Sequence, residues 1–292
     1  MSIWAHIEDQ ITQKTQQPFH ISNKDSMGGG CINTSCRISD GGMHYFVKVN
    51  HSRFADMFEA EAKGLQVMAA SNTIKVPAPV CYGVLENQCY IVMEYLDLAG
   101  RPDSVELARQ LAAMHRVTAD RFGWSINNTI GSTLQVNTPG DDWIEFWREH
   151  RLGFQLQLAV SNGYGGELQS SGERLLDEFP MLFESYRPQA SMLHGDLWGG
   201  NYGGLPDSTP VIFDPAFYYG DREADLAMTT LFGGFSTDFY RAYDEAYPLD
   251  DGYAVRKQFY NVYHVINHLN LFGGGYHGQA VSMIKRVLAE IG

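Results

Sequence analysis

Three polar residues in the last third of the sequence have the types and the spacing that phosphoryl transfer requires. Asp196 and Asn201 lie five residues apart in the segment HGDLWGGN, and Asp214 follows the apolar run PVIF. The reaction needs a carboxylate that orients the attacking hydroxyl, and an amide oxygen and a second carboxylate that hold a metal ion against the phosphates. We therefore expect Asp196 to be the catalytic base and Asn201 and Asp214 to be the metal ligands.

Taken singly, each of these residues has an ordinary explanation, because Asp is common in Gly-rich turns and before Pro. Together they are harder to explain in this way. An apolar run precedes each acidic residue, and the order and spacing match the kinase patterns H-R-D-x-x-x-x-N and D-F-G. The set is therefore interpreted as a kinase site, with ATP and Mg²⁺ as the implied cofactors.

Two charged residues in the first third of the chain could hold the nucleotide phosphates. A kinase places a strand lysine against these phosphates and a helical glutamate beside the lysine. Lys48 in YFVKVN and Glu61 in a predicted helix fit these two roles. Both could instead be ordinary surface charges, but Glu61 falls on the apolar face of its helix, which favours the functional interpretation.

A glycine-rich loop between the first two predicted strands could cover the phosphates. Gly28, Gly29 and Gly30, followed by Asn33, would let backbone N–H groups approach closely, because glycine has no Cβ atom. The loop matches neither GxGxxG nor the Walker pattern, so its position is the main argument for this role. Cys31 would lie near the same N–H groups, which favour a reactive thiolate, so oxidation could block ATP or cross-link two chains. Alternatively, Cys31 is a small residue that fits the loop.

The elements that must position these residues begin with a β-rich first third. Residues 18–27, 34–39 and 44–50 predict three antiparallel strands, and Asp40-Gly41-Gly42 is typical of a hairpin turn. From Phe54 onward the apolar residues recur with a helical period, and residues 89–96 form an apolar run of strand length. A small lobe with one helix follows from this pattern.

Beyond residue 96 the pattern becomes mainly helical. Ser104 can cap a helix in which an apolar stripe is formed by Val105, Ala108, Leu111, Ala112 and His115. Residues 141–159 and 167–185 also have a helical period. The short apolar runs SMLHGDL and PVIFDP predict two strands of a hairpin in this large lobe. The overall prediction is an α+β, bilobal, protein-kinase-like fold, with a nucleotide-binding lobe over 1–96 and a catalytic and substrate lobe over 97–292.

Composition and charge exclude several functional classes. The formal net charge of −13 argues against a nucleic-acid partner and suits a cationic substrate. The N-terminal segment does not look like a secretory signal, and no apolar stretch has spanning length, so we expect a cytoplasmic protein without a membrane partner.

The four cysteines form no CxxC pair, so neither a zinc site nor a disulfide framework is expected. A monomer is the expected state.

Several segments together resemble the fructosamine kinase (ketosamine-3-kinase) family, whose relatives include aminoglycoside phosphotransferases and choline kinases. The resemblance runs nearly end to end and is carried by GGGCIN, FVKVN, MFEAEAKGL, IVMEYL, LARQLAAMHR, FGW, HGDLWGGN and IFDPAFYYGDREADLAM. It implies a kinase that phosphorylates the third-carbon hydroxyl of a ketosamine, on a free amine or on a protein lysine. The phosphate of that product then eliminates and restores the amine, so the implied role is protein deglycation.

The resemblance also implies roles for individual residues. The hinge that binds adenine through backbone groups would consist of Met93, Glu94, Tyr95 and Leu96. Asp225 in GDREADLA resembles the acid that braces the catalytic loop by hydrogen bonds, and His194 would be a second structural residue of that loop. An ordinary acid near a helix N-terminus is the alternative for Asp225.

The most specific marker of the family is Trp198 in HGDLWGGN, because broader phosphotransferases of this fold usually carry another residue there. Its indole could be a platform for a sugar ring or a cationic amine, or it could be part of the core. Trp143, Trp147 and Arg148 lie on a helix that resembles the substrate side of the family. They are weaker candidates for substrate contacts.

Two departures from protein kinases bear on the substrate. The metal motif is Asp-Pro-Ala instead of Asp-Phe-Gly, and GDREADLA follows too soon for a long activation segment. A peptide kinase is therefore disfavoured. Two alternatives stay open: a kinase for another alcohol, such as an aminoglycoside or a choline-like compound, and a pseudokinase that only binds nucleotide.

Overall fold

The computed structural model describes residues 2–28 and 32–292 of the chain. These residues divide into two compact units. The first contains Met1–Gln110 and Gly200–Pro215, and the second contains Leu111–Gly199 and Ala216–Gly292. The predicted α+β class is confirmed by the elements of both units, whereas the lobe boundary after residue 96 stays a prediction.

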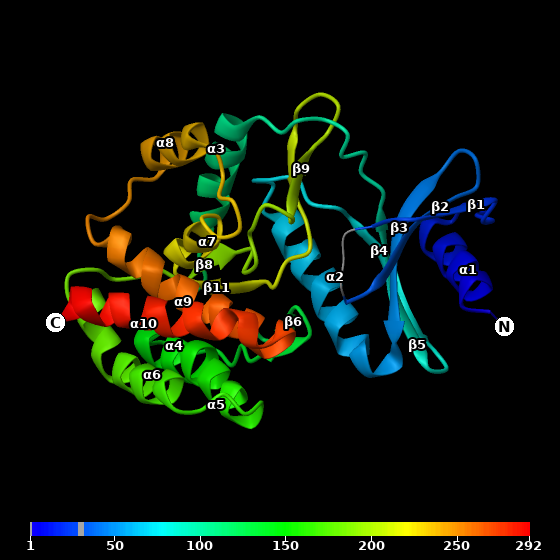
Figure 1. Cartoon of the computed structure of the whole chain (residues 1–292). Helices are drawn as coiled ribbons and strands as arrows, with labels where there is room; N and C mark the ends of the chain where they lie inside the picture. Colours follow the sequence, from blue (N-terminus) through cyan, green and yellow to red (C-terminus); the bar gives the residue numbers. More distant parts are fainter. Residues whose placement is uncertain (1, 29–31) are drawn as a thin grey trace. The chain divides into compact units, whose positions relative to one another are not determined.

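The first unit is built on a five-stranded antiparallel sheet with the strand order β1-β2-β3-β5-β4 (Figure 1). Its elements are α1 (Ile3–Thr15), β1 (Asn23–Ser26), β2 (Thr34–Ser39), β3 (His44–His51), α2 (Ala55–Ala70), β4 (Pro79–Leu85), β5 (Gln88–Glu94), β9 (Tyr202–Gly204) and β10 (Pro210–Ile212). The predicted hairpin between β2 and β3 is confirmed, and Asp40 Oδ1 accepts hydrogen bonds from the N–H groups of Gly42 and Met43 in its turn.

The two faces of this sheet pack against different helices. Side chains alternate along β3, so Val47 and Val49 join the apolar cluster under α1, while Lys48 reaches Glu61 of α2. Helix α1 was not predicted, and the expectation of a single helix in this region was wrong. Its signal was the four-residue spacing of Ile3, Ile7 and Ile11, the three buried residues of that helix.

The predicted pairing of the two short strands around the catalytic segments was wrong. Strand β10 pairs with β9 in the first unit. Strand β8 (Ser191–Leu193), which precedes HGDL, pairs instead with β11 (Tyr218–Gly220) in the second unit. Each predicted strand thus exists, but each has a partner of only three residues that apolar periodicity did not reveal.

The second unit is mainly helical. Its elements are β6 (Asn128–Ile130), β7 (Thr133–Gln135), α4 (Trp143–Trp147), α5 (Gly153–Ser161), α6 (Glu167–Glu178), β8, β11, α7 (Arg222–Met228), α8 (Thr237–Ala246), α9 (Tyr253–Phe272) and α10 (His277–Ile291). Helix α9 runs through the core, where it packs against α5, α7 and α10. In the described part of the chain, no helix combines the length and the apolar character needed to cross a bilayer.

Helix α3 (Ser104–His115) spans the division between the two units. Its cap is Asp103 and not Ser104, because Asp103 Oδ1 accepts hydrogen bonds from the N–H groups of Val105 and Glu106 at 2.9 and 3.0 Å. The predicted cap was therefore wrong by one residue. Aspartate and serine are both common at this position, so residue type alone does not choose between neighbours.

Candidate active site

Lys48 lies at the centre of an ionic cluster in the first unit. Only 4% of its surface is exposed. Its Nζ atom donates hydrogen bonds to Glu61 Oε1 at 2.7 Å and to Asp214 Oδ1 at 2.6 Å. The structure therefore brings together three predicted site residues from β3, α2 and the segment after β10.

The two carboxylates keep Lys48 charged although it is buried. Burial alone would lower the pKa of Lys48, because it disfavours the ammonium form. The charges of Asp214 and Glu61 outweigh burial, and they raise the pKa above its ordinary value. With both carboxylates ionised, one positive and two negative charges leave the cluster at −1. An additional cation beside it would be stabilised.

The β9–β10 hairpin places Asn201 and Asp214 at the same end. Asn201 precedes β9 and Asp214 follows β10, and the Phe213 N–H donates to the Asn201 carbonyl at 3.0 Å. Asp214 has a φ of +59°, which is uncommon for a residue with a Cβ atom. Strained backbone of this kind concentrates at functional sites, where the surrounding structure holds it in place.

The donors at this end of the hairpin fit Mg²⁺. This ion prefers oxygen ligands and is usually bound by one or two carboxylates together with substrate phosphates. Asp214 offers a carboxylate whose side chain is 46% exposed, and Asn201 offers an amide oxygen. Among the described residues no group of three or more His, Cys, Asp or Glu side chains could hold a metal. Phosphate oxygens of the nucleotide and water molecules are the ligands that usually complete such a site.

The other residues predicted to bind nucleotide also belong to the first unit, as far as the structure describes them. Met93 and Glu94 end β5, and the Glu94 carboxylate pairs with Lys75 at 3.0 Å. Tyr95 and Leu96 follow the strand. In the glycine-rich loop, Asn33 Oδ1 accepts a hydrogen bond from Asn50 at 2.7 Å. Gly28 is described, whereas Gly29, Gly30 and Cys31 lie outside the described residues.

Asp196 belongs to the second unit and follows β8 directly after a fixed turn. The preceding residues are held by Asp225 of α7, which accepts hydrogen bonds from the N–H groups of His194 and Gly195, both at 2.7 Å. Gly195 has a φ of +83°, and a Cβ atom there would lie 2.1 Å from the Ala216 carbonyl oxygen. Glycine is therefore required at this position.

The turn is also tied to Asp196 itself. The Asp196 N–H donates to Nδ1 of His194 at 3.2 Å, and His194 is fully buried. Burial alone would raise the pKa of Asp225, but the hydrogen bond from His115 and the nearby His194 outweigh it and lower this pKa. Asp225 thus stays ionised as an acceptor for the loop.

Trp198 is exposed and begins a row of aromatic rings in the second unit. Its indole is 36% exposed and meets Phe232 edge to face at 6.2 Å. Phe232 in turn lies 4.7 Å from the ring of His268, which contacts Phe272 and Tyr276. Sequence reasoning missed Phe232 and His268, because residues 34 and 70 positions away carry no local sign of contact.

Trp143 and Trp147 are placed differently from Trp198. Both are buried in the core of the second unit, with 3% and 0% of their surfaces exposed. The Trp143 indole N–H donates to the Tyr260 hydroxyl at 2.9 Å. Rings buried in this way have no free face for a substrate. Arg148 follows α4, and its guanidinium lies over the ring of Phe179 at 5.4 Å.

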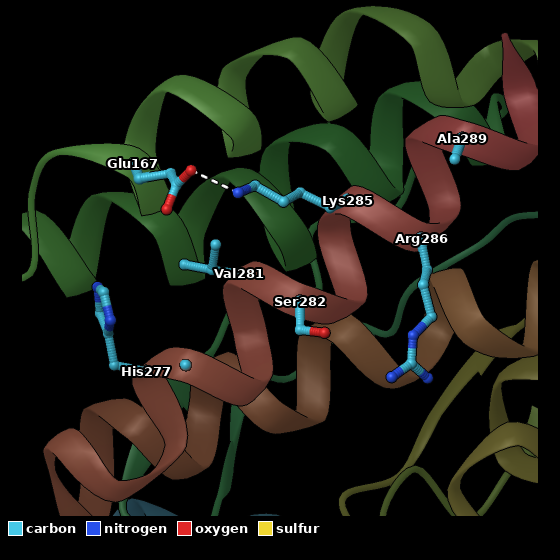
Figure 2. A pocket seen from close by; sticks show the side chains of 8 residues that line it. Glu167, His277, Val281, Ser282, Lys285, Arg286 and Ala289 are labelled. Carbon is cyan, nitrogen blue, oxygen red and sulfur yellow. Dashed lines mark ion pairs between the residues drawn. The ribbon is translucent and has the colours of Figure 1, made fainter.

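A surface cavity of about 580 Å³ lies elsewhere in the second unit, between the start of α6 and α10 (Figure 2). Glu167 and Lys285 form an ion pair at 2.5 Å, and both side chains are more than half exposed. Exposed pairs of this kind stabilise little. None of the candidate site residues in the described chain lines this cavity. We therefore do not assign the active site to it.

His264 on α9 is a buried histidine that should make the protein sensitive to acid. Burial, with a smaller effect of His268, lowers its pKa to about 3. The unfolded chain takes up this proton near pH 6.5. Between pH 6.5 and 3 the unfolded state therefore binds more protons, and stability falls as the pH falls.

We expect the wild type to lose about 2 kcal/mol more unfolding free energy between pH 7 and pH 5 than His264→Gln, which cannot titrate. Urea unfolding at the two pH values measures this difference. Parallel losses in the two proteins would contradict the assignment.

A family model and several known proteins each match nearly the whole chain. The model of the family described as fructosamine kinase matches residues 3–290. A probable ketoamine kinase of Synechocystis sp. is 46% identical, over 98% of this chain and 97% of that protein. The chloroplastic protein-ribulosamine 3-kinase of Arabidopsis thaliana is 42% identical, over 98% of this chain and 86% of that protein.

A solved structure gives the same result for the fold. The crystal structure of a fructosamine-3-kinase family member from Haemophilus somnus 129PT superposes with a TM-score of 0.90 at 27% identity, covering 98% of this chain and 100% of that one. The predicted kinase-like fold is confirmed. By the family match and by these relatives, the chain belongs to the fructosamine kinase family of phosphotransferases.

Proposed function

We propose that this protein transfers the γ-phosphoryl group of ATP to the third-carbon hydroxyl of a ketosamine. The observation that carries the proposal is the double pairing of Lys48 with Glu61 and Asp214, in a chain that belongs to the fructosamine kinase family. The names of the relatives, ketoamine kinase and protein-ribulosamine 3-kinase, support this acceptor class. The product phosphate would eliminate and release the amine, so the proposed role is deglycation.

Each residue of the site has one task in this proposal. Asp196 accepts a hydrogen bond from the acceptor hydroxyl and takes its proton as the bond to phosphorus forms. Lys48, held by Glu61, offsets the negative charge on the nucleotide phosphates. Asn201 and Asp214 hold Mg²⁺, which supplies further charge stabilisation at the phosphate oxygens when it is bound.

The acceptor would meet the second unit near Trp198. This indole is exposed two residues after the proposed base, and a flat ring of this type attracts the cationic amine of a ketosamine. The net charge of −13 favours the same cation at longer range. Both observations suit an adduct on a free amine and an adduct on a lysine of a protein.

The proposal is tested by measuring Mg²⁺-dependent ATP consumption with ribulose-lysine, fructose-lysine and an aminoglycoside as acceptors. We expect turnover with the ketosamines and a product whose phosphate is lost on incubation with recovery of free lysine. Faster turnover of the aminoglycoside would favour another alcohol as the substrate. ATP binding without transfer to any acceptor would indicate a pseudokinase.

Replacing Lys48 with Met should lower kcat/KM for ATP by about 10²–10³-fold, because it removes a preorganised positive charge from the phosphates. Glu61→Gln is the matched variant, since it keeps the cation at 2.7 Å from a neutral acceptor. It should lower kcat/KM by about tenfold or less. Steady-state kinetics with varied ATP measure both. An equal loss in Glu61→Gln would show that Lys48 needs the charge of Glu61 to act, and an unchanged kcat/KM in Lys48→Met would contradict the role of Lys48.

A further inference from the structure

His115, the last residue of α3, contacts both α8 and α7. Its side chain is fully buried, and both ring nitrogens have partners. Nδ1 lies 2.7 Å from the Tyr243 hydroxyl of α8, and Nε2 lies 3.3 Å from Oδ2 of Asp225 on α7. The imidazole is therefore the bridge between a tyrosine and the carboxylate that holds the catalytic loop.

The neighbouring donors decide which nitrogen of His115 carries the proton. Arg222 can only donate, and its Nη1 lies 3.3 Å from the Tyr243 hydroxyl. This hydroxyl accepts from Arg222 and directs its own proton to Nδ1 of His115. The Nε2–H group then donates to Asp225. The other tautomer would point a lone pair at a buried carboxylate, which is unfavourable where no water can intervene.

Asp225 passes this constraint to the backbone before Asp196. Its two oxygens accept separately, Oδ2 from the His194 N–H and Oδ1 from the Gly195 N–H. The carboxylate therefore cannot rotate without breaking both bonds. The Nε2–H group of His115 is the third donor to this carboxylate and the second to Oδ2.

We propose that His115 is a positioning residue for the catalytic base. Backed by Tyr243, it holds the Asp225 carboxylate in the orientation that fixes the His194–Gly195 backbone and, through it, Asp196. This inference rests on the proposed role of Asp196, and His115 itself need not touch either substrate. Sequence reasoning placed His115 only at the end of an apolar helical stripe.

Two amide variants separate this role from simple packing. The side-chain N–H of Gln reaches the position of Nε2, so His115→Gln should keep the donor to Asp225. Asn is shorter and reaches only the position of Nδ1, so His115→Asn should lose that donor. We expect His115→Asn to lower kcat by about 10–100-fold with little change in KM for ATP. His115→Gln should keep most of the wild-type kcat.

Amide hydrogen exchange, followed by mass spectrometry over residues 190–197, gives a readout that does not depend on activity. The His194 and Gly195 amides should exchange faster in His115→Asn than in His115→Gln or the wild type. Equal exchange and equal kcat in the two variants would overturn the proposal. If the wild type proved inactive on ketosamines, the proposed function would fail, while the exchange result would still decide the role of His115.

Tyr243→Phe provides a second route if His115→Asn does not fold. It removes one hydroxyl and keeps the buried ring, so the fold should persist. Without the donor to Nδ1, the tautomer of His115 is no longer fixed. We expect a several-fold lower kcat and faster exchange of the same two amides. Wild-type values for both quantities would also overturn the proposal.

Discussion

Replacing Asp196 with Asn is expected to lower kcat by about 10²–10⁴-fold and to leave ATP binding nearly unchanged. Asparagine has almost the same shape as aspartate but cannot take the proton of the acceptor hydroxyl. Asparagine keeps three backbone bonds of this turn, in which the Asp196 N–H donates to His194 and the two preceding amides donate to Asp225. The loop should therefore keep its conformation.

The two halves of this prediction are measured separately. Steady-state turnover with saturating ribulose-lysine gives kcat, and calorimetric titration with a non-hydrolysable ATP analogue gives the Kd. Asp207→Asn is the control, because Asp207 is an acid in the turn between β9 and β10 whose carboxylate accepts a hydrogen bond from the Thr209 N–H at 3.0 Å. This control should have wild-type turnover. If Asp196→Asn also retained wild-type turnover, Asp196 could not be the base.

The parts of the site that could be predicted are those encoded in short stretches of sequence. Asp196 and Asn201 are five residues apart, so one loop carries both and residue type with spacing is enough. The helical period that placed Glu61 on an apolar face is likewise local. The ion pair between Lys48 and Asp214 joins residues 166 positions apart and was not predicted, although each residue had been assigned to the site separately.

The parts that were missed depend on contacts between distant segments. The partners of β8 and β10 are β11 and β9, whose sequences YYG and YGG lack the alternation of a typical strand. The bridge from His115 to Tyr243 spans 128 residues. A histidine on an apolar stripe shows that it is buried, but not which groups satisfy its nitrogens.

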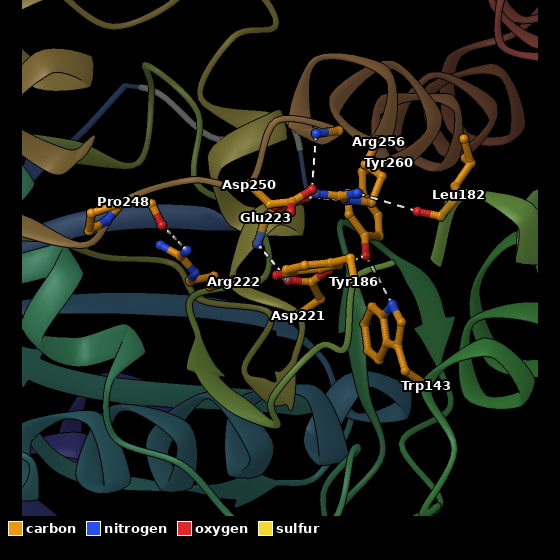
Figure 3. Close-up of polar contacts among 11 residues, drawn as sticks. Trp143, Leu182, Tyr186, Asp221, Arg222, Glu223, Pro248, Asp250, Arg256 and Tyr260 are labelled. Atoms are coloured by element: carbon orange, nitrogen blue, oxygen red, sulfur yellow. Dashed lines mark hydrogen bonds and ion pairs between the residues drawn. The ribbon is translucent and has the colours of Figure 1, made fainter. Parts of the chain in front are cut away.

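Arg256→Met is expected to lower the unfolding free energy by about 3–5 kcal/mol. Arg256 is buried on α9, and it donates from Nε and Nη2 to the two oxygens of Glu223 at 2.7 and 3.0 Å (Figure 3). Nη2 also donates to Asp250 at 2.6 Å. Methionine has a similar length but no charge, so it would leave Glu223 buried without its cation.

The buried acids near Arg256 make this loss of unfolding free energy larger than the loss expected for an exposed ion pair. Glu223 is fully buried, and Asp221, also fully buried, begins the same helix. Burial raises the pKa of Glu223 to about 7, although the hydrogen bonds from Arg256 act in the opposite direction. Without Arg256 the pKa of Glu223 would rise further, so the folded protein would take up a proton on Glu223 near neutral pH. This uptake reduces the loss of unfolding free energy at low pH. The destabilisation should therefore be greater at pH 8 than at pH 6.

Urea unfolding at both pH values would measure this effect against two comparisons. Lys285→Met removes the exposed partner of Glu167, a pair of 2.5 Å with both side chains more than half exposed, and should cost less than about 1 kcal/mol. The double variant Arg256→Met with Glu223→Gln removes both charges and should recover more than about 1 kcal/mol of the loss. A single variant as stable as Lys285→Met would show that Glu223 does not depend on Arg256. No recovery in the double variant would instead assign the loss to the other contacts of Arg256, with Asp250 and with the Leu182 carbonyl.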